Sequence, residues 1–376
     1  MIFTSYSFFI FLIVVLSVYR LLNYLKLVPV AKIWLILASF YFYAQGAKEF
    51  LPFFIGSVFF NYIIGSTLIV TKDKISRKVL LALGLIQNLG LLGYFKYANF
   101  FVENYNLLTK SNIELGRIIL PIGISFFTFQ LIAYLIDCYR GETKEYSVID
   151  YLLFITFFPQ LIVGPIVHHK DIVPQFESEQ QSKFNKERFF LGLFIFSIGC
   201  AKKVMLADPL TSYAKIFFAN VNDFGTLDAW LSSLSFTLSY YFDLSGYADM
   251  AIGMGFLFNI KLPENFNSPY KARNFREYWQ RWHMTLSQFL SNYVFRSVFK
   301  KGRGSFNFYF AVMTTFFVSG FWHGAGWQFI VWGIVNGIFV CMSHFMIRKK
   351  WSLPFPLAWS LTFAGVVGTR ILFVSK

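Results

Sequence analysis

Charged residues and cysteines are scarce in this chain, and each scarcity excludes a class of protein. Charged side chains make up 14% of the 376 residues, against about 25% in a typical soluble domain. The three cysteines stand apart, with no C-x-x-C pair, so neither a disulfide framework nor a thiolate metal site is indicated. No internal repeat, low-complexity tract or polar stretch of domain length is present. One integral domain over residues 1–376 is therefore expected.

Apolar and aromatic residues are abundant instead. Hydrophobic residues account for 56% of the chain and aromatic residues for 21%, with 50 Phe. Because about 20 consecutive apolar residues cross the hydrocarbon layer as a helix, the runs predict an all-α polytopic membrane protein with about ten transmembrane helices. The predicted segments are 2–25, 28–45, 50–70, 79–97, 117–138, 150–169, 188–206, 228–258, 305–322, 327–347 and 356–374.

Two of these segments differ from simple spans. The run 150–169 contains Pro159 and Pro165, and the run 228–258 is too long for one crossing. Either could be broken or partly re-entrant, an arrangement that a bilayer tolerates only where the chain is surrounded by protein.

Basic residues outnumber acidic ones, 34 to 19, which gives a net charge of +15. They gather just beyond apolar runs, at 72–78, 300–303 and 348–350, as they do in the cytoplasmic loops of membrane proteins. The charge therefore indicates orientation in a lipid bilayer, and nucleic-acid binding is not expected.

The segment 271–303 carries eight basic residues and one acid, Glu277. Its pattern predicts an amphipathic helix at the cytoplasmic interface, in which Glu277 pairs with Arg281 four positions later. The polar face comprises Gln280, His283 and Ser287, and the apolar face Trp279, Trp282 and Leu286.

His323 lies in Gly-Phe-Trp-His323-Gly-Ala-Gly-Trp, at membrane depth, where a polar side chain has few water contacts. A packed histidine satisfied by backbone or water is the simplest explanation. The neighbours favour another, because Gly320, Gly324 and Gly326 would let a substrate approach the backbone and Trp322 and Trp327 could wall a pocket. A neutral imidazole there could take the proton of an alcohol that attacks a thioester or ester carbonyl.

The other histidines carry weaker signals. His283 could be an interfacial residue on a solvated helix face, or part of the same site as His323. Two histidines without a third ligand nearby make a weak zinc site, so no metal is expected. His168 and His169 are interpreted as residues of an interfacial loop.

Two carboxylates, Asp243 and Asp249, lie in an apolar stretch and are expected to face the bundle interior. Their spacing puts them on different helix faces, whereas Ser245 and Asp249 share one. A buried brace to arginine or tyrosine is one explanation, and a role at the site is the other. Gly253 and Gly255 lack the third glycine and the preceding strand of a dinucleotide site.

Taken together, these motifs resemble the membrane-bound O-acyltransferases, and within them the branch of bacterial alginate O-acetylation and peptidoglycan O-acetyltransferase proteins. D-alanyl transfer to teichoic acid is a related branch. The likeness covers nearly the whole chain. It rests on Tyr-Trp-Gln-Arg-Trp-His283-Met-Thr-Leu-Ser, Phe-Asp243-Leu-Ser-Gly-Tyr-Ala-Asp249-Met-Ala-Ile-Gly, Pro159-Gln-Leu-Ile-Val-Gly-Pro165-Ile and the His323 string.

The resemblance implies that His323 is the catalytic histidine and His283 a second histidine needed for activity. It also implies a protein funnel in which an acetyl group from a cytoplasmic donor, acetyl coenzyme A, reaches an acceptor beyond the membrane. Basic residues of 271–303 would attract the donor's phosphates, and no bound cofactor is expected. Further contacts to substrate or donor are expected from Trp282, Arg281, Ser287, Asp243, Asp249, Trp322 and Gly324.

The resemblance further implies a bacterial inner-membrane location and a periplasmic esterase-like partner that delivers the acetyl group to peptidoglycan or an exopolysaccharide. Transfer of D-alanyl or another acyl group is one alternative, and a proton-coupled transporter of a sugar or lipid intermediate is an alternative of another class. Two departures stand out. Residues 296–302 replace the Pro-Leu-Gly-Gly turn common in relatives, and helices that commonly follow a segment like 357–374 are expected to be missing.

Overall fold

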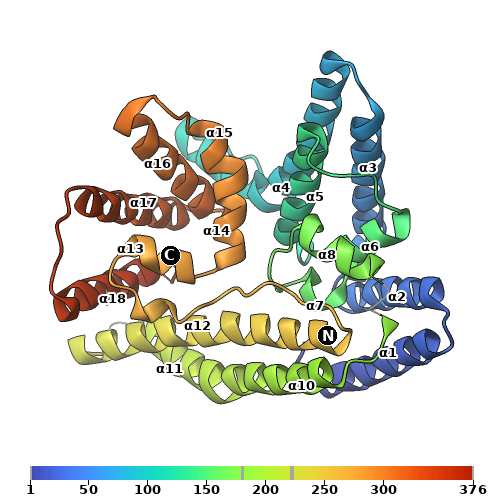
Figure 1. Ribbon diagram of the computed structural model, residues 1–376. Coiled ribbons are helices and arrows are strands. Elements are labelled where there is room, and N and C mark those ends of the chain that lie inside the picture. Colours follow the sequence, from blue (N-terminus) through green and yellow to red (C-terminus); the bar gives the residue numbers. More distant parts are fainter. Residues whose placement is uncertain (1, 179–181, 221–223, 375–376) are drawn as a thin grey trace. The chain divides into compact units, whose positions relative to one another are not determined.

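The computed structural model describes residues 2–178, 182–220 and 224–374, and every regular element within these ranges is a helix (Figure 1). The predicted all-α class is therefore confirmed.

The chain folds as two compact units. The first contains Met1–Ile198 and Asp249–Pro263, and the second contains Gly199–Ala248 and Glu264–Lys376. Two long helices begin in one unit and end in the other, α10 (Lys186–Ala201) and α12 (Thr226–Leu257). The single integral domain expected from the sequence stays a prediction.

Long helices make up most of the first unit. They begin at ordinary caps, such as Ser5, whose Oγ accepts a hydrogen bond from the Phe8 backbone N–H at 3.3 Å. Phenylalanine builds the core, where the ring of Phe42 lies 5.9 Å from those of Phe8 and Phe11. The helices are α1 (Tyr6–Tyr24), α2 (Val28–Ala47), α3 (Leu51–Val70), α4 (Lys74–Thr109) and α5 (Ile124–Arg140), with a 3₁₀ turn at Lys48–Phe50.

The predicted segment 150–169 is broken, which was one of the two arrangements that its prolines allowed. Three short helices lie along it, α6 (Val148–Thr156), α7 (Phe158–Leu161) and α8 (His169–Glu177). Pro159 stands in the first turn of α7, where a missing N–H does not interrupt the helix. The chain from 150 to 161 is buried within its unit. The segment 228–258, by contrast, is one unbroken helix up to Leu257, where α12 ends.

A hairpin of two long helices, α16 and α17, dominates the second unit, and His323 lies at its turn. The helices are α11 (Asp208–Ala219), α13 (Phe275–Arg281), α14 (Met284–Leu290), α15 (Arg296–Val298), α16 (Gly304–His323), α17 (Trp327–Arg348) and α18 (Phe355–Ile371). Tighter or wider turns flank them: π turns at Lys202–Ala207 and Ser291–Phe295, and a 3₁₀ turn at Pro269–Lys271.

Five helical stretches of the described chain are long and apolar enough to cross a membrane. They are Tyr6–Tyr24, Val28–Val70, Lys74–Thr109, Lys186–Ala219 and Trp327–Arg348. The membrane character predicted from composition is thus supported by the length of the helices. The expected total of about ten crossings is not established.

Candidate active site

Glycines set the close approach of α16 and α17 just before His323. A Cβ at Gly320 would lie 2.3 Å from the Phe329 carbonyl oxygen and 3.0 Å from the Cα of Gly333, so only glycine permits this crossing. A Cβ at Gly324 would lie 2.1 Å from the ring of Phe329. The sequence suggested that the space beside these glycines would be open to a substrate. In the structure α17 fills that space.

Aromatic side chains surround the half-buried ring of His323. Its centroid lies 4.9 Å from the rings of Trp322 and Trp332 and 5.3 Å from that of Phe373. Trp327, which was predicted to wall the site, is 61% exposed. Trp332, nearly fully buried on α17, takes that position instead.

The predicted amphipathic helix in 271–303 is not one helix. It breaks between α13 and α14, where Trp282 is extended and His283 is left-handed with φ 45° and ψ 53°. The backbone N–H of Met284 donates to the Asn265 carbonyl at 2.9 Å, and Asn267 N–H donates to the Arg281 carbonyl at 2.9 Å. An adjacent stretch of chain thus satisfies backbone groups that the helix would otherwise have paired.

His283 is buried at this break, being only 7% exposed. Its ring lies 6.0 Å from Phe266 and 6.5 Å from Trp322. Burial lowers the pKa of His283 to about 4, and the positive charge of Arg370 acts in the same direction. The imidazole is therefore neutral near pH 7. Because Trp322 also contacts His323, the fold brings the two predicted histidines to one tryptophan.

Residues of α13, α14 and the break between them that were predicted to contact substrate already contact other parts of the protein. Arg281 Nη2 lies 2.9 Å from Glu277 Oε1, which confirms the predicted pair, and its Nη1 donates to the Asn267 carbonyl at 3.3 Å. Trp282 is almost fully buried. Ser287 donates to the Trp279 carbonyl at 3.2 Å.

The two predicted carboxylates of α12 are both half-buried and only partly face the interior. Asp243 Oδ1 lies 2.6 Å from Lys203 Nζ, and the same ammonium lies 2.7 Å from Asp208 Oδ1. The sequence allows a polar brace as one of two explanations for these carboxylates. Asp243 forms such a brace, with lysine in place of the expected arginine or tyrosine.

A cavity of about 350 Å³ lies within the second unit, between α13, α14, α16 and α17. Apolar side chains form most of its lining, with Ser287, Ser319 and Thr315 supplying hydroxyls and Arg276 and His344 supplying basic groups. Such a volume, lined mainly by apolar groups with few polar ones, is typical of a small-molecule site. Its complete lining is Arg276, Trp279, Gln280, Leu286, Ser287, Leu290, Ser291, Phe295, Phe308, Val312, Thr315, Phe316, Ser319, Val340 and His344.

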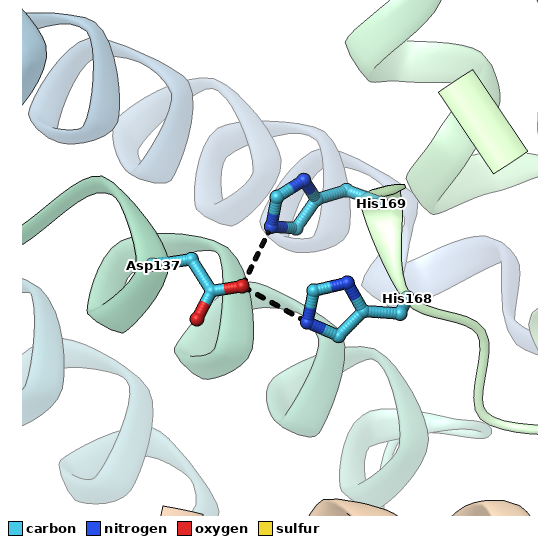
Figure 2. A group of neighbouring side chains, drawn as sticks. All are labelled: Asp137, His168 and His169. Carbon is cyan, nitrogen blue, oxygen red and sulfur yellow. Dashed lines mark hydrogen bonds and ion pairs between the residues drawn. The ribbon is translucent and has the colours of Figure 1, made fainter. Parts of the chain in front are cut away.

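Figure 2 shows a separate polar cluster, in the first unit, that the sequence interpretation missed. The Nε2 atoms of His168 and His169 each lie 2.9 Å from Asp137 Oδ2. Tyr146 Oη lies 2.8 Å from the other ring nitrogen of His169. His169 is fully buried, so its assignment to an interfacial loop was wrong.

By ligand type this cluster could hold a metal ion, since its three ligand atoms lie within 4.8 Å of one another. The ammonium of Lys170 lies 3.4 Å from the same Asp137 oxygen. Positive charge therefore already faces the carboxylate, and two imidazoles already bond to it. Hydrogen bonding accounts for the arrangement.

Comparison with known proteins gives a consistent result. Residues 74–362 match the family model described as MBOAT, membrane-bound O-acyltransferase family. A peptidoglycan O-acetyltransferase of Helicobacter pylori is 42% identical over 92% of this chain and 71% of that protein. A probable alginate O-acetylase AlgI of Pseudomonas aeruginosa is 38% identical over 97% of this chain and 71% of its own. A teichoic acid D-alanyltransferase of Bacillus subtilis is 29% identical over 67% of this chain and 65% of that protein.

Proposed function

The chain belongs to the membrane-bound O-acyltransferase family, and we propose that it acetylates hydroxyls of a bacterial envelope polysaccharide. The family makes the protein an O-acyltransferase. Support for acetyl as the group and polysaccharide as the acceptor comes from relatives that are named for peptidoglycan and alginate. D-alanyl transfer, named for a relative that matches less of the chain, is the alternative product to distinguish.

In the proposed reaction a thioester donor, acetyl coenzyme A, meets the acceptor hydroxyl at His323. One ring nitrogen takes the hydroxyl proton while the oxygen attacks the carbonyl carbon. The tetrahedral intermediate then collapses, the C–S bond breaks, and the departing sulfur receives the proton. The products are an acetyl ester and a free thiol, and a base in this position contributes about 10²–10⁴-fold to the rate.

His283 lies against the same tryptophan, Trp322, and assists this step. Because the imidazole is buried and neutral, it can donate and accept one hydrogen bond each. It therefore orients the donor or completes a proton path and does not act as a cation.

The cavity between α13 and α17 is the proposed location of the donor. Its apolar lining suits an acyl chain and the thiol arm of the donor. Arg276 belongs to that lining, and its charge would attract a phosphate. Ser287 and Thr315 belong to the same lining.

The hairpin of α16 and α17 supports the proposal that the donor reaches His323 from the cytoplasm and the acceptor from the opposite side of the membrane. Basic residues stand at the start of α16, with Arg303 exposed, and at the end of α17, with Arg348 exposed. The 20 residues of α16 extend about 30 Å at 1.5 Å per residue. By the positive-inside bias, we place the basic ends in the cytoplasm, and His323 then lies toward the opposite face of the bacterial inner membrane. A periplasmic esterase-like partner would receive the acetyl group there.

The test is mass analysis of envelope polysaccharides from cells that carry the wild-type gene, no gene, His323→Ala or His168→Ala. His168 is a matched control because it is a half-buried histidine of the other unit. We expect ester-linked acetate in wild-type and His168→Ala cells and its loss in the other two. Normal amounts of ester-linked acetate in His323→Ala cells at equal protein level would rule out the mechanism. D-alanyl esters in place of acetyl esters in wild-type cells would show that the protein transfers D-alanyl and not acetyl.

A further inference from the structure

Arg370 is a buried cation on the last turn of α18. The residue is 3% exposed and belongs to an apolar segment, where a charged side chain is costly and is a candidate functional group. Its guanidinium carbon lies 4.2 Å from the ring centroid of Trp282 and 4.6 Å from that of Tyr240. Its Nη2 donates to the Tyr278 hydroxyl at 2.9 Å.

No carboxylate in the described part of the chain pairs with Arg370. Acids elsewhere in its unit pair with other bases, as Glu277 does with Arg281 and Asp243 with Lys203. Ring faces and a neutral phenol offset only part of the cost of removing a charge from water. The described residues therefore bury a positive charge without supplying its counterion.

The guanidinium has donors to spare for such a counterion. It carries five N–H groups in a planar fork, and its one hydrogen bond within the described chain is to Tyr278. A fork of this kind binds anionic oxygen with charge-assisted hydrogen bonds. The contact with the Trp282 ring, 4.2 Å from the guanidinium carbon, holds the fork in place in advance.

The aromatic rings around the cation connect it to both histidines. The ring of Phe373 is 5.5 Å from the Arg370 guanidinium carbon and 5.3 Å from the His323 ring. Trp282, on which Arg370 stacks, directly precedes His283. One aromatic side chain, Phe373, thus contacts both Arg370 and His323, which places the cation one side chain away from the proposed proton acceptor.

Starting from the proposed acyl transfer, we propose that Arg370 binds the oxyanion that forms on the acyl carbonyl. As the acceptor oxygen attacks, the electron pair of the C=O π bond moves onto the carbonyl oxygen, and the guanidinium donates hydrogen bonds to it. When the C–S bond breaks, that pair returns to the carbonyl. Arg370 stays protonated throughout. His323 thus accepts the proton while Arg370 stabilises the negative charge, and the step uses no carboxylate.

The test compares purified wild type, Arg370→Met, Arg370→Lys, Arg370→Ala and the control Arg348→Met for kcat, KM and unfolding temperature. Methionine keeps an unbranched side chain without charge, and Arg348 is an exposed arginine of the same unit. Loss of one oxyanion donor lowers kcat by about 10²–10³-fold. We expect that fall in Arg370→Met with KM for acetyl coenzyme A unchanged, a smaller fall in Arg370→Lys, and an unfolding temperature no lower than wild type. Added guanidinium ion should restore part of the kcat of Arg370→Ala.

Three results would overturn the inference. If Arg370→Met keeps the wild-type kcat and KM, the residue takes no part in the reaction. If kcat is unchanged but KM is raised, Arg370 binds an anionic group that the substrate already carries before the reaction. A lowered unfolding temperature without rescue by guanidinium makes it structural. The proposed function fails separately, by the absence of acetyl transfer in wild type, and Arg370 is then tested by the same ratios on whichever acyl ester the wild type forms.

Discussion

Replacement of Gly320 by alanine should move His323 without touching its side chain. The new methyl carbon would start 2.3 Å from the Phe329 carbonyl oxygen, a backbone atom that cannot rotate away. To reach an ordinary contact of 3.4 Å, α17 must retreat from α16 by about 1 Å. Overpacking of this kind costs about 1–3 kcal/mol. Because Gly320 lies one turn before His323, a displacement of about 1 Å should also lower the rate by about 10²-fold.

The assay is acetyl ester formation per folded protein, measured together with the unfolding temperature in detergent. Gly90→Ala is the matched control, since Gly90 is a helical glycine of α4 with nothing within 4 Å of its built Cβ. That change should raise helix stability by about 0.8–1 kcal/mol and leave acetylation unchanged. If Gly320→Ala matched wild type in both measurements, the close crossing of α16 and α17 would not be what positions His323.

Three further changes test other parts of the account. His283→Gly should accumulate at least as well as His283→Ala, because a non-glycine residue at φ 45° costs about 1–2 kcal/mol. Both variants should be inactive. Activity in the glycine variant would show that the imidazole takes no part in the mechanism. Thr315→Trp fills the cavity of about 350 Å³ and should raise KM for acetyl coenzyme A at least about tenfold, equal to about 1.4 kcal/mol; an unchanged KM would locate the donor elsewhere. Asp137→Asn removes the charge shared by His168 and His169 and should lower stability by about 1–3 kcal/mol in a thermal unfolding assay, whereas an unchanged midpoint would show the cluster to be dispensable.

Apolar runs predicted the long helices well because lipid and core both select continuous hydrophobic segments. The same patterns could not reveal the break at His283. Periodicity continues through residues 279–287, and nothing local forces a left-handed histidine there. The break depends on Asn265 and Asn267, whose backbone groups bond across it, and such pairing is decided by tertiary contacts.

Site residues could be predicted where they belong to a sequence motif. They could not be predicted where folding brings them together from separate parts of the chain. The two histidines stood out, but Trp332 and Phe373 lie among many other aromatic residues and had no distinguishing signal. Arg370 did carry one, because it is a lone arginine in the apolar run 356–374. The burial of His169 depends on Asp137, which is remote in sequence and could not be paired from spacing alone.

The central claim is that the imidazole of His323 accepts the acceptor's proton during acetyl transfer. The most direct measurement is the initial rate at which purified protein, supplied with the periplasmic fraction that holds its proposed partner, moves labelled acetyl from acetyl coenzyme A to a soluble glycan. Wild type, which must form product, is compared with His323→Gln at equal folded concentration. The account predicts a loss of about 10²–10⁴-fold in the variant with an unchanged unfolding temperature. Equal rates in the two proteins would contradict it.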